Sequence, residues 1–265
     1  MGKNGPEVLE TVAADLHVHT CLSPCATLDM TPTKIVHEAR KKGLAIIAIT
    51  DHNSAENAGA VVAAARDTGL WVIPGIEVTS TEEAHIVGLF SDTERAFSMQ
   101  ELIYETLQKG ENKEELFGIQ VVANELDEVE SINKRILIGA TDLSSEEVVQ
   151  AIHDRGGLAV AAHIDRQSFS IVSQLGFIPD ELSLDAIEIS SRMRLDEARK
   201  VFEAYDWAPF ITASDAHDLE EVGTSPTWFR VGHRDMPELR LALAGVEGRK
   251  IIKGNTESFQ GANLH

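Results

Sequence analysis

The chain has 265 residues, of which 43% are hydrophobic and 25% charged, an ordinary composition for a globular protein with one large core. Its 43 acidic and 23 basic residues give a formal net charge of −20. Such a surface repels polyanions, so extended nucleic acid and anionic membranes are not expected as partners. A small phosphorylated substrate is compatible with this charge, because bound cations reverse the field inside one pocket.

The sequence indicates a cytoplasmic protein. No apolar run approaches the ~20 residues that span a bilayer. The first residues lack the basic and apolar segments of a secretory signal. Cys21 and Cys25 are the only cysteines, too few for a disulfide framework.

Short apolar runs alternate with amphipathic segments along most of the chain. The runs predict strands at residues 14–19, 45–50, 71–78, 85–90, 158–163, 186–189 and 210–213. The segments between them predict helices at 32–42, 54–68, 144–155, 195–205 and 236–246. This alternation predicts a largely parallel sheet covered on both faces, and the number of units favours an α/β barrel. No GxGxxG or GxxxxGK[ST] motif follows a strand, which weakens a nucleotide-binding fold.

Residues 91–143 break this alternation. Residues 91–118 are polar and predict helix, whereas residues 119–139 predict two strands around an acidic turn at 125–130. We therefore expect residues 1–90 and 144–265 to form the barrel and residues 91–143 to form a small insertion over its mouth. The alternative is an ordinary excursion of the barrel itself.

Metal-binding residue types gather at the strand ends that should face the barrel mouth, where α/β barrels carry their active sites. His17 and His19 lie two residues apart at the end of the first strand, so both side chains point the same way. The others lie at the ends of later strands: His52, Glu77, His85, His163, Asp215 and His217. One such histidine is more often a satisfied polar group, but six of ten histidines at one face favour a metal centre.

These side chains cannot converge without a cation, because burial would cost desolvation and the carboxylates would repel each other. Imidazoles mixed with carboxylates suit zinc, manganese or iron better than calcium or magnesium. More than four ligands imply more than one ion, so we expect two or three divalent ions, with Glu77 as the natural bridge. The remaining histidines are expected to be solvated: His37, His153, His233 and His265.

The motifs HVH, TDH, GIE, AHIVGL, AAH and SDAH follow one another between His17 and His217. In this order they resemble the PHP (polymerase and histidinol phosphatase) family of metal-dependent phosphoesterases. The resemblance implies a distorted, TIM-like (β/α)7 barrel with a trinuclear site. It implies three ligand sets: His17, His19, Glu77 and Asp215 for one ion; Glu77, His85 and His163 for a second; His52 and His217 for a third.

The third set needs another ligand from the loop after the first strand, where this chain departs from the family pattern. Many relatives have Asp or His five or six residues after the HxH motif, where this chain has Pro24 and Cys25. A Cys25 thiolate would favour a softer ion such as zinc or iron. Asp29 is the alternative ligand, and Cys21 is expected only to pack.

We therefore predict an enzyme, a metal-dependent phosphoesterase that hydrolyses a small phosphate ester such as a nucleotide, sugar or amino-alcohol phosphate. The ions flanking Glu77 would generate the attacking hydroxide. Arg166, three residues after His163, is expected to clamp a phosphate oxygen, and Asp215 joins Glu77 and Arg166 as the catalytic set. A structural ion pair between Arg166 and Asp165 is the alternative for this arginine.

Asp15 and Asp51 are not expected to bind the ions directly; we expect them to hold ligand histidines in orientation.

Two alternatives belong to other classes of protein. An amidohydrolase-like hydrolase of C–N or ester bonds also begins with HxH, but it usually has a bridging lysine and ends on a lone aspartate. A catalytically idle, metal-stabilised module of a larger assembly is the other alternative. The nearly complete ligand set argues against the idle module.

Overall fold

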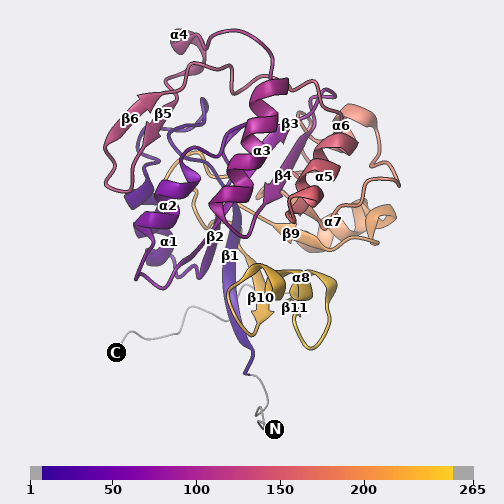
Figure 1. Ribbon diagram of the computed structural model, residues 1–265. Helices are drawn as coiled ribbons and strands as arrows, with labels where there is room; N and C mark the ends of the chain where they lie inside the picture. The colour runs from indigo at the N-terminus through magenta and orange to yellow at the C-terminus, as the bar shows by residue number, and fades with distance from the viewer. Residues whose placement is uncertain (1–7, 253–265) are drawn as a thin grey trace.

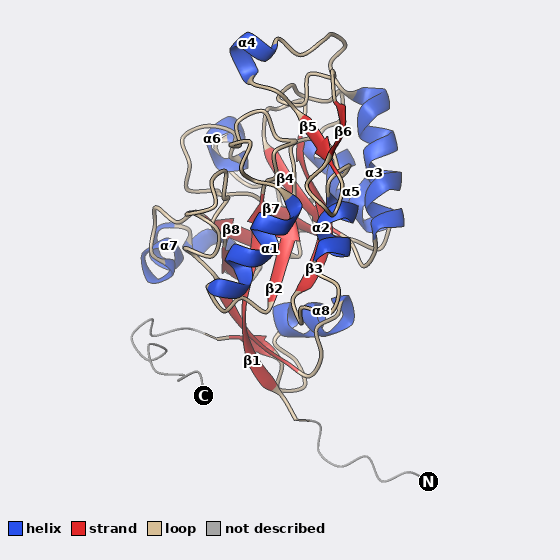
Figure 2. Cartoon of the chain, turned by 90° about the vertical axis from the view of Figure 1, so that its left-hand side faces the viewer, coloured by secondary structure: helices blue, strands red, loops and turns tan. Residues whose placement is uncertain are grey.

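The computed structural model describes residues 8–252, so the expectation for His265 lies outside the described residues. Nine strands form the main sheet: β1 (Glu10–Val18), β2 (Ile46–Ile49), β3 (Trp71–Thr79), β4 (His85–Leu89), β7 (Leu158–Ala161), β8 (Ala186–Ile189), β9 (Phe210–Thr212), β10 (Thr227–Val231) and β11 (Lys250–Ile251). Their order is β11-β10-β1-β2-β3-β4-β7-β8-β9. The sheet curls into a barrel with helices around its outside (Figures 1 and 2).

The barrel closes where the segment after β9 meets β1. Val18 pairs in parallel with Ala216, and the amide of His19 donates to the carbonyl of Ala216 at 3.0 Å. The predicted distorted, TIM-like α/β barrel is therefore confirmed. All seven predicted strands are present, and β10 and β11, which were not predicted, extend the sheet beyond β1.

The sheet is less uniformly parallel than predicted, because β4 runs antiparallel to both β3 and β7. Only residues 80–84 connect β3 to β4, and so short a link allows a hairpin but no helical crossover. The reversal places the first residue of β4, His85, opposite Thr79 near the end of β3. His85 thus reaches the mouth from the start of its strand.

The helices are α1 (Pro32–Lys41), α2 (Ala58–Ala64), α3 (Thr93–Thr106), α4 (Glu114–Phe117), α5 (Ser145–Asp154), α6 (Ile171–Leu175), α7 (Leu195–Val201) and α8 (Met236–Ala244), with a 3-10 turn at Glu203–Tyr205. Ser144 and Glu147 form a capping box at the start of α5. Helix α2 begins later than predicted because Asn57 is engaged elsewhere. Its side chain bonds to the backbone of Val121 (2.9 Å) and Ala123 (3.0 Å).

Side-chain alternation along the strands separates two apolar cores. One core fills the barrel and includes Ile46, Ala48 and Ile73, and the other lies between the sheet and the helices and includes Ile47 and Ile49. The same alternation continues toward the carboxyl ends of the strands, where polar residues take the inward positions. On β3, for example, Glu77 lies on the same face as Ile73, four residues earlier.

Strand β1 needs an irregularity to bring its histidines to the interior. Leu16 belongs to the interior core and Val18 to the outer core, and the register between β1 and β2 shifts between Asp15 and Val18. A β-bulge changes which face the following residues occupy. His17 and His19 therefore face the interior although their odd-numbered neighbour Ala13 faces outward.

Residues 91–143 form α3, α4 and a hairpin of β5 (Val121–Ala123) and β6 (Val129–Ile132). Figure 1 shows α4 and the hairpin at one end of the molecule and α8 with β10 and β11 at the other. A small apolar cluster joins the hairpin region to the loop after β1: Leu22, Leu107, Val122 and Leu137. The division of the chain into a barrel and an insertion stays a prediction.

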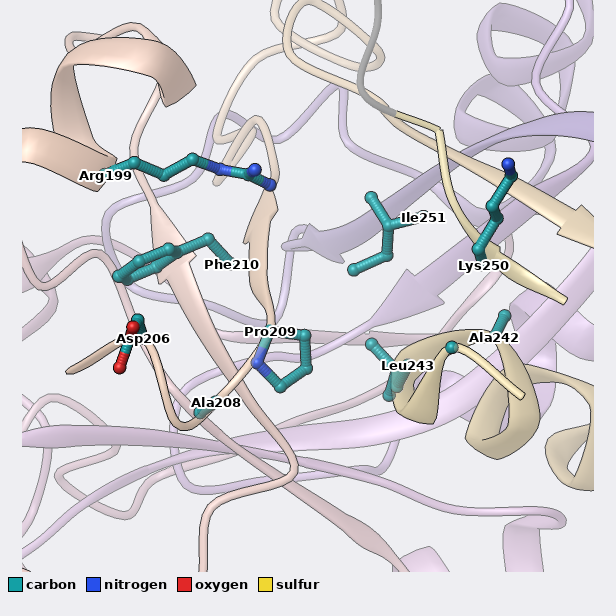
Figure 3. A pocket seen from close by; sticks show the side chains of 10 residues that line it. Arg199, Asp206, Ala208, Pro209, Phe210, Ala242, Leu243, Lys250 and Ile251 are labelled. Carbon is teal, nitrogen blue, oxygen red and sulfur yellow. The ribbon is translucent and has the colours of Figure 1, made fainter. Parts of the chain in front are cut away.

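A pocket of about 420 Å³ opens at the barrel end opposite the predicted metal ligands, near the start of β9 (Figure 3). Arg199, Asp206, Phe210 and Lys250 are among the residues that line it. Asp215 follows the opposite end of the same strand. The pocket is therefore separate from the predicted site.

Gly75 of β3 should not tolerate a side chain. A Cβ there would lie 2.7 Å from the carbonyl oxygen of Gly88 and 2.9 Å from Thr50 Cγ2. We expect Gly75→Ala to lower the free energy of unfolding by about 1–3 kcal/mol. Gly59→Ala is the control, because its Cβ would meet nothing closer than Phe97 Cζ at 3.7 Å and should stabilise helix α2 by about 0.5–1 kcal/mol. Urea unfolding measures both, and equal stability of the two variants would contradict this packing.

Candidate metal centre

The predicted ligands converge at one end of the barrel, each placed by the end of a strand. His17 lies on β1, Glu77 on β3 and His85 on β4, whereas His19, His52, His163, Asp215 and His217 follow β1, β2, β7 and β9. All are buried except His217, which is partly exposed. Within the described residues, three groups have ligand atoms within 4.8 Å of one another: His19, His52 and His217; His17, His19 and Glu77; and His52, Glu77 and His85.

Glu77 lies at the middle of this cluster. Its Oε1 is 2.8 Å from His85 Nδ1, 3.2 Å from His163 Nε2 and 3.3 Å from His17 Nε2. Its Oε2 is 2.8 Å from His52 Nδ1 and 3.5 Å from His19 Nε2. A carboxylate shared by five imidazoles has the position that a bridge between ions requires.

Hydrogen bonds fix where the protons of the two β1 histidines lie. His17 Nδ1 is 2.8 Å from a carboxylate oxygen of Glu188, so it donates. The Ser23 hydroxyl donates to Asp51 at 2.6 Å and therefore accepts from His19 Nδ1 at 2.9 Å. Both Nε2 atoms are consequently unprotonated when these imidazoles are neutral.

Those two Nε2 atoms lie only 3.1 Å apart in a fully buried site. In neutral imidazoles two nitrogen lone pairs at this distance repel each other, and either a proton shared by the two rings or a metal ion between them removes the repulsion. Two nitrogens that each ligate one tetrahedral ion at about 2.1 Å would lie roughly 3.4 Å apart. The arrangement of His17 and His19 therefore fits a shared metal ion.

Other buried atoms of the cluster support the same conclusion. His52 Nδ1, His85 Nδ1 and Glu77 Oε2 form no hydrogen bond in the described part of the protein. The two nitrogens nevertheless lie 2.8 Å from Glu77 oxygens, so what is missing is suitable bond geometry. Buried polar atoms without partners are costly, and coordination to an ion removes that cost.

Charge in the cluster is also unbalanced without an ion. Burial would raise the pKa of Glu77, but the surrounding imidazoles, His85 first, hold it well below its usual range. Burial lowers the pKa of His85 to about 4, and burial with His217 and His52 lowers that of His19 well below normal. Against burial, Glu188, Asp215 and Glu77 raise the pKa of His17. Divalent ions would supply the positive charge that protons must otherwise provide.

The loop after β1 brings Cys25 to the third group. Its Sγ is 3.2 Å from His52 Nε2. Burial raises the pKa of Cys25, but His52 and His217 outweigh it and lower the value to about 6. Burial raises the pKa of Cys21 to about 12, and that thiol faces the carbonyl of Val121 at 3.7 Å.

The alternative ligand, Asp29, is directed to the surface. Its side chain is 71% exposed and lies 2.5 Å from Lys34 Nζ. The geometry thus favours Cys25 over Asp29, and the role of Cys25 as a ligand stays a prediction.

Arg166 lies at the mouth but does not pair with Asp165. Its Nη1 is 2.5 Å from Asp215 Oδ2, whereas Asp165 accepts from the amide and hydroxyl of Ser190 at 2.8 and 2.6 Å. The alternative of an Arg166–Asp165 pair is therefore wrong. A guanidinium beside a candidate metal ligand is positioned to meet an anion that binds there.

Asp51 orients a histidine at one remove from the predicted ions, as expected, because the Ser23 hydroxyl donates to its carboxylate and accepts from His19. Asp15 differs from the expectation, since its carboxylate hydrogen bonds reach no histidine. It accepts from Ser214 and from the amide of Gly223, and so fixes the loop that carries Asp215. His153, predicted to be solvated, is half-buried and lies 2.8 Å from Asp185. His37 and His233 are exposed as expected.

Glu188 is a functional residue that the sequence interpretation missed. It is 1% exposed on β8 and follows Ala186 on the inward face, and within the described residues its carboxylate forms one hydrogen bond, which holds His17. The signal was present, because Glu188 is the only polar residue in the buried strand AIEI. A carboxylate in that position needs a buried polar partner.

Backbone strain is concentrated at this mouth. Asn53, His163, Phe169 and Asp215 all have φ in the left-handed region, between 30° and 57°. Non-glycine residues adopt this conformation at a cost of order 1–3 kcal/mol, and such residues cluster at functional sites. Two of the four are predicted ligands.

A family model described as the PHP domain matches residues 15–167. The chain belongs to the PHP domain family. The prediction of a metal-dependent hydrolase acting on phosphoester bonds is confirmed at this level. The match begins at Asp15, just before the first predicted ligand, His17, and includes every predicted ligand up to His163.

Two relatives with nuclease names resemble the chain. It is 28% identical to the 5'-3' exoribonuclease Rnm of Escherichia coli K12, over 89% of this chain and 92% of the relative. Endonuclease Q of Pyrococcus furiosus, a lesion-specific endonuclease, superposes with a TM-score of 0.73 at 21% identity, over 91% of this chain and 58% of that one. Endonuclease Q is also known in complex with a 27-mer duplex (TM-score 0.72). At such identity these structures show the fold alone.

The expectation of a small phosphorylated partner, with extended nucleic acid excluded by charge, is contradicted by these relatives. The charge argument failed because it summed the whole surface. At physiological ionic strength, charges more than about 8 Å from a bound phosphate are largely screened. The field of ions and of Arg166 at the mouth matters more there than the total of −20.

An amidohydrolase from Chromobacterium violaceum also shares the fold, with a TM-score of 0.53 at 22% identity over 79% of this chain and 89% of that one. This likeness shows the fold and not the reaction. The metal-ligand groups of the described residues contain Glu77, and no lysine interacts with it. The amidohydrolase alternative therefore gains no support from the site.

Glu188→Gln should weaken metal binding. The neutral amide cannot balance the charge on His17, so we expect about ten- to a hundredfold lower metal affinity, measured by competition with a chelator. Glu238→Gln is the matched control, a buried glutamate that pairs with Arg249 at 2.9 Å on helix α8. It should change the melting temperature without changing metal affinity. Equal metal affinity in wild type and Glu188→Gln would remove the proposed role.

Cys25→Ser should remove one metal ion per chain if the thiolate completes the third group. In the cobalt-substituted protein, the variant should also lose the thiolate-to-cobalt charge-transfer band. Cys21→Ser should keep both the band and the metal content. Unchanged spectra in both variants would show that the third site contains no thiolate.

Proposed function

We propose that this protein is a metal-dependent nuclease that hydrolyses phosphodiester bonds in nucleic acid. The observation that carries the proposal is the convergence of the Nε2 atoms of His17 and His19 on the Glu77 carboxylate, which fits metal ions. The choice of substrate is supported by the exoribonuclease relative, whose similarity extends over nearly the whole of both chains. The shared fold with endonuclease Q, a lesion-specific endonuclease, also supports a nucleic-acid substrate.

The cluster would hold two or three divalent ions, with zinc, manganese and iron as the candidates for its donor set. One group comprises His17, His19, Glu77 and Asp215, a second Glu77, His85 and His163, and a third His52, His217 and Cys25. Bound ions would act as Lewis acids toward the phosphate and would lower the pKa of water, so that hydroxide is available for attack near neutral pH. The protein supplies Glu77 to hold two groups in register.

Arg166 would hold the substrate phosphate. Its side chain is one-quarter exposed and its Nε is buried without a hydrogen-bond partner in the described residues. The next loop along the mouth, after β8, carries two more exposed arginines, Arg192 and Arg194. Ser190 joins the two loops through Asp165. Of these arginines, Arg166 pairs with Asp215 and Arg194 pairs with Asp196 at 3.0 Å, so the two loops offset the acidic total only locally and in part.

Arg166→Ala should lower kcat/KM by about ten- to a hundredfold, which corresponds to losing one charged hydrogen-bonding group of roughly 1.5–3 kcal/mol. Metal content should be unchanged, because arginine does not ligate a cation. Arg166→Lys should recover only part, since an ammonium cannot reproduce the bidentate contact. If the arginine serves only to hold Asp215, the alanine variant would instead lose metal and stability.

The function is tested by supplying metal-reconstituted protein with end-labelled single-stranded RNA and DNA, and separately with a panel of phosphomonoesters. The proposal expects oligonucleotides to be cut with the higher kcat/KM. Glu77→Gln should abolish cutting, and His37→Ala, on the exposed face of α1, should leave it unchanged. Faster turnover of the monoesters, or no cutting with any of the three metals, would refute the proposal.

A further inference from the structure

One exposed aromatic side chain lies beside the metal centre without contributing to the fold. Phe169, in the loop after β7, is 40% exposed and belongs to none of the apolar clusters of the described residues. Its backbone has φ 57°, in the left-handed region. A bulky side chain in that conformation is strained, and strain of this kind persists where the surroundings impose it.

The surroundings of Phe169 do impose its position. Its carbonyl accepts from the amide of His85 at 2.9 Å. Ser170, buried, donates to the carbonyl of Arg166 at 2.9 Å and accepts from the amide of Ser173 at the start of α6. The loop is thus fixed at both ends of the phenylalanine, and the ring is presented in a defined place.

The Phe169 ring is separated from the candidate metal centre by the imidazole of His85. The Phe169 ring lies 4.9 Å from the His85 ring, centroid to centroid, with an angle of 20° between the planes. The same imidazole reaches Glu77 with its Nδ1, at 2.8 Å. Arg166, three residues earlier in the same loop, reaches Asp215. One loop therefore places a guanidinium and an aromatic ring on neighbouring sides of the position for a bound phosphate.

We propose that Phe169 is the stacking platform for an unpaired nucleobase adjacent to the scissile phosphate. The inference rests on the proposed nuclease function and adds how the substrate is held. One face of the ring is stacked on His85, and the exposed part of the side chain is left for a ligand. Stacking of a base on an aromatic ring is tolerant of sequence, because every base has a π-face. It requires a base that is out of its pair, so the substrate at this position is single-stranded, a strand end or a flipped nucleotide.

The experiment compares two single-stranded oligonucleotides, one intact and one with an abasic nucleotide beside the bond that product mapping identifies. Phe169→Leu should lower kcat/KM on the intact oligonucleotide by about tenfold or more, the size of one base–aromatic stack. On the abasic oligonucleotide the wild type should already show this loss, and Phe169→Leu should change it less than twofold. Phe169→Trp should retain activity on the intact strand.

Phe177→Leu is the matched control, because Phe177 is 57% exposed and lies beyond α6. It should match wild type on both strands. An equal loss on the two strands by Phe169→Leu, accompanied by lower metal content, would overturn the platform and leave the ring as a support for His85. Cutting of both strands at wild-type rates by Phe169→Leu would also overturn it, while leaving the nuclease function standing. If the wild type cuts neither strand, the proposed function itself fails and the platform fails with it.

Discussion

The mouth of this barrel is organised around the positive charge that a buried cluster of imidazoles and carboxylates requires. The Nε2 atoms of His17 and His19 face each other at 3.1 Å beside the buried Glu77 carboxylate, and the Nδ1 atom of each ring donates a hydrogen bond on its other side. Neutral rings would bring two lone pairs together there, so a proton or a metal ion must lie between them. In the described residues, His52 Nδ1, His85 Nδ1 and Glu77 Oε2 are buried without a hydrogen bond. Coordination to metal ions would satisfy such atoms, and for this reason the ligand geometry, and not the ligand inventory alone, argues for a metal centre.

Several departures from a regular barrel follow from this requirement. The bulge in β1 turns His17 and His19 inward, the reversal of β4 brings His85 to the mouth, and left-handed backbone at His163 and Asp215 places the last ligands. The left-handed backbone at His163 and Asp215 costs stability that the apolar cores must offset. The hydrogen bonds of Asp15 to the loop after β9, and of Glu188 to His17, hold these irregular segments in place.

The sequence predicted the barrel, and it predicted which candidate ligands would meet at its mouth, because both depend on local patterns. Apolar alternation identifies strands, and a histidine or glutamate that ends such a run is visible without knowledge of the fold. The antiparallel β4 escaped prediction, since strand direction depends on which neighbour is available across a short turn. Glu188 escaped because its partner, His17, is 171 residues away. The substrate was misjudged for a different reason: net charge is a global sum, whereas binding responds to the few groups within a screening length of the site.

The central claim is that this cluster holds metal ions that act on a nucleic-acid phosphate. The most direct test is anomalous diffraction from crystals of metal-reconstituted protein grown with a single-stranded oligonucleotide that carries a phosphorothioate at the scissile position. The account predicts two or three anomalous peaks within bonding distance of the His17, His52 and His85 groups, at least two of them sharing Glu77, with the phosphorothioate bound against them. A single peak away from Glu77, or an oligonucleotide bound elsewhere on the barrel, would contradict it.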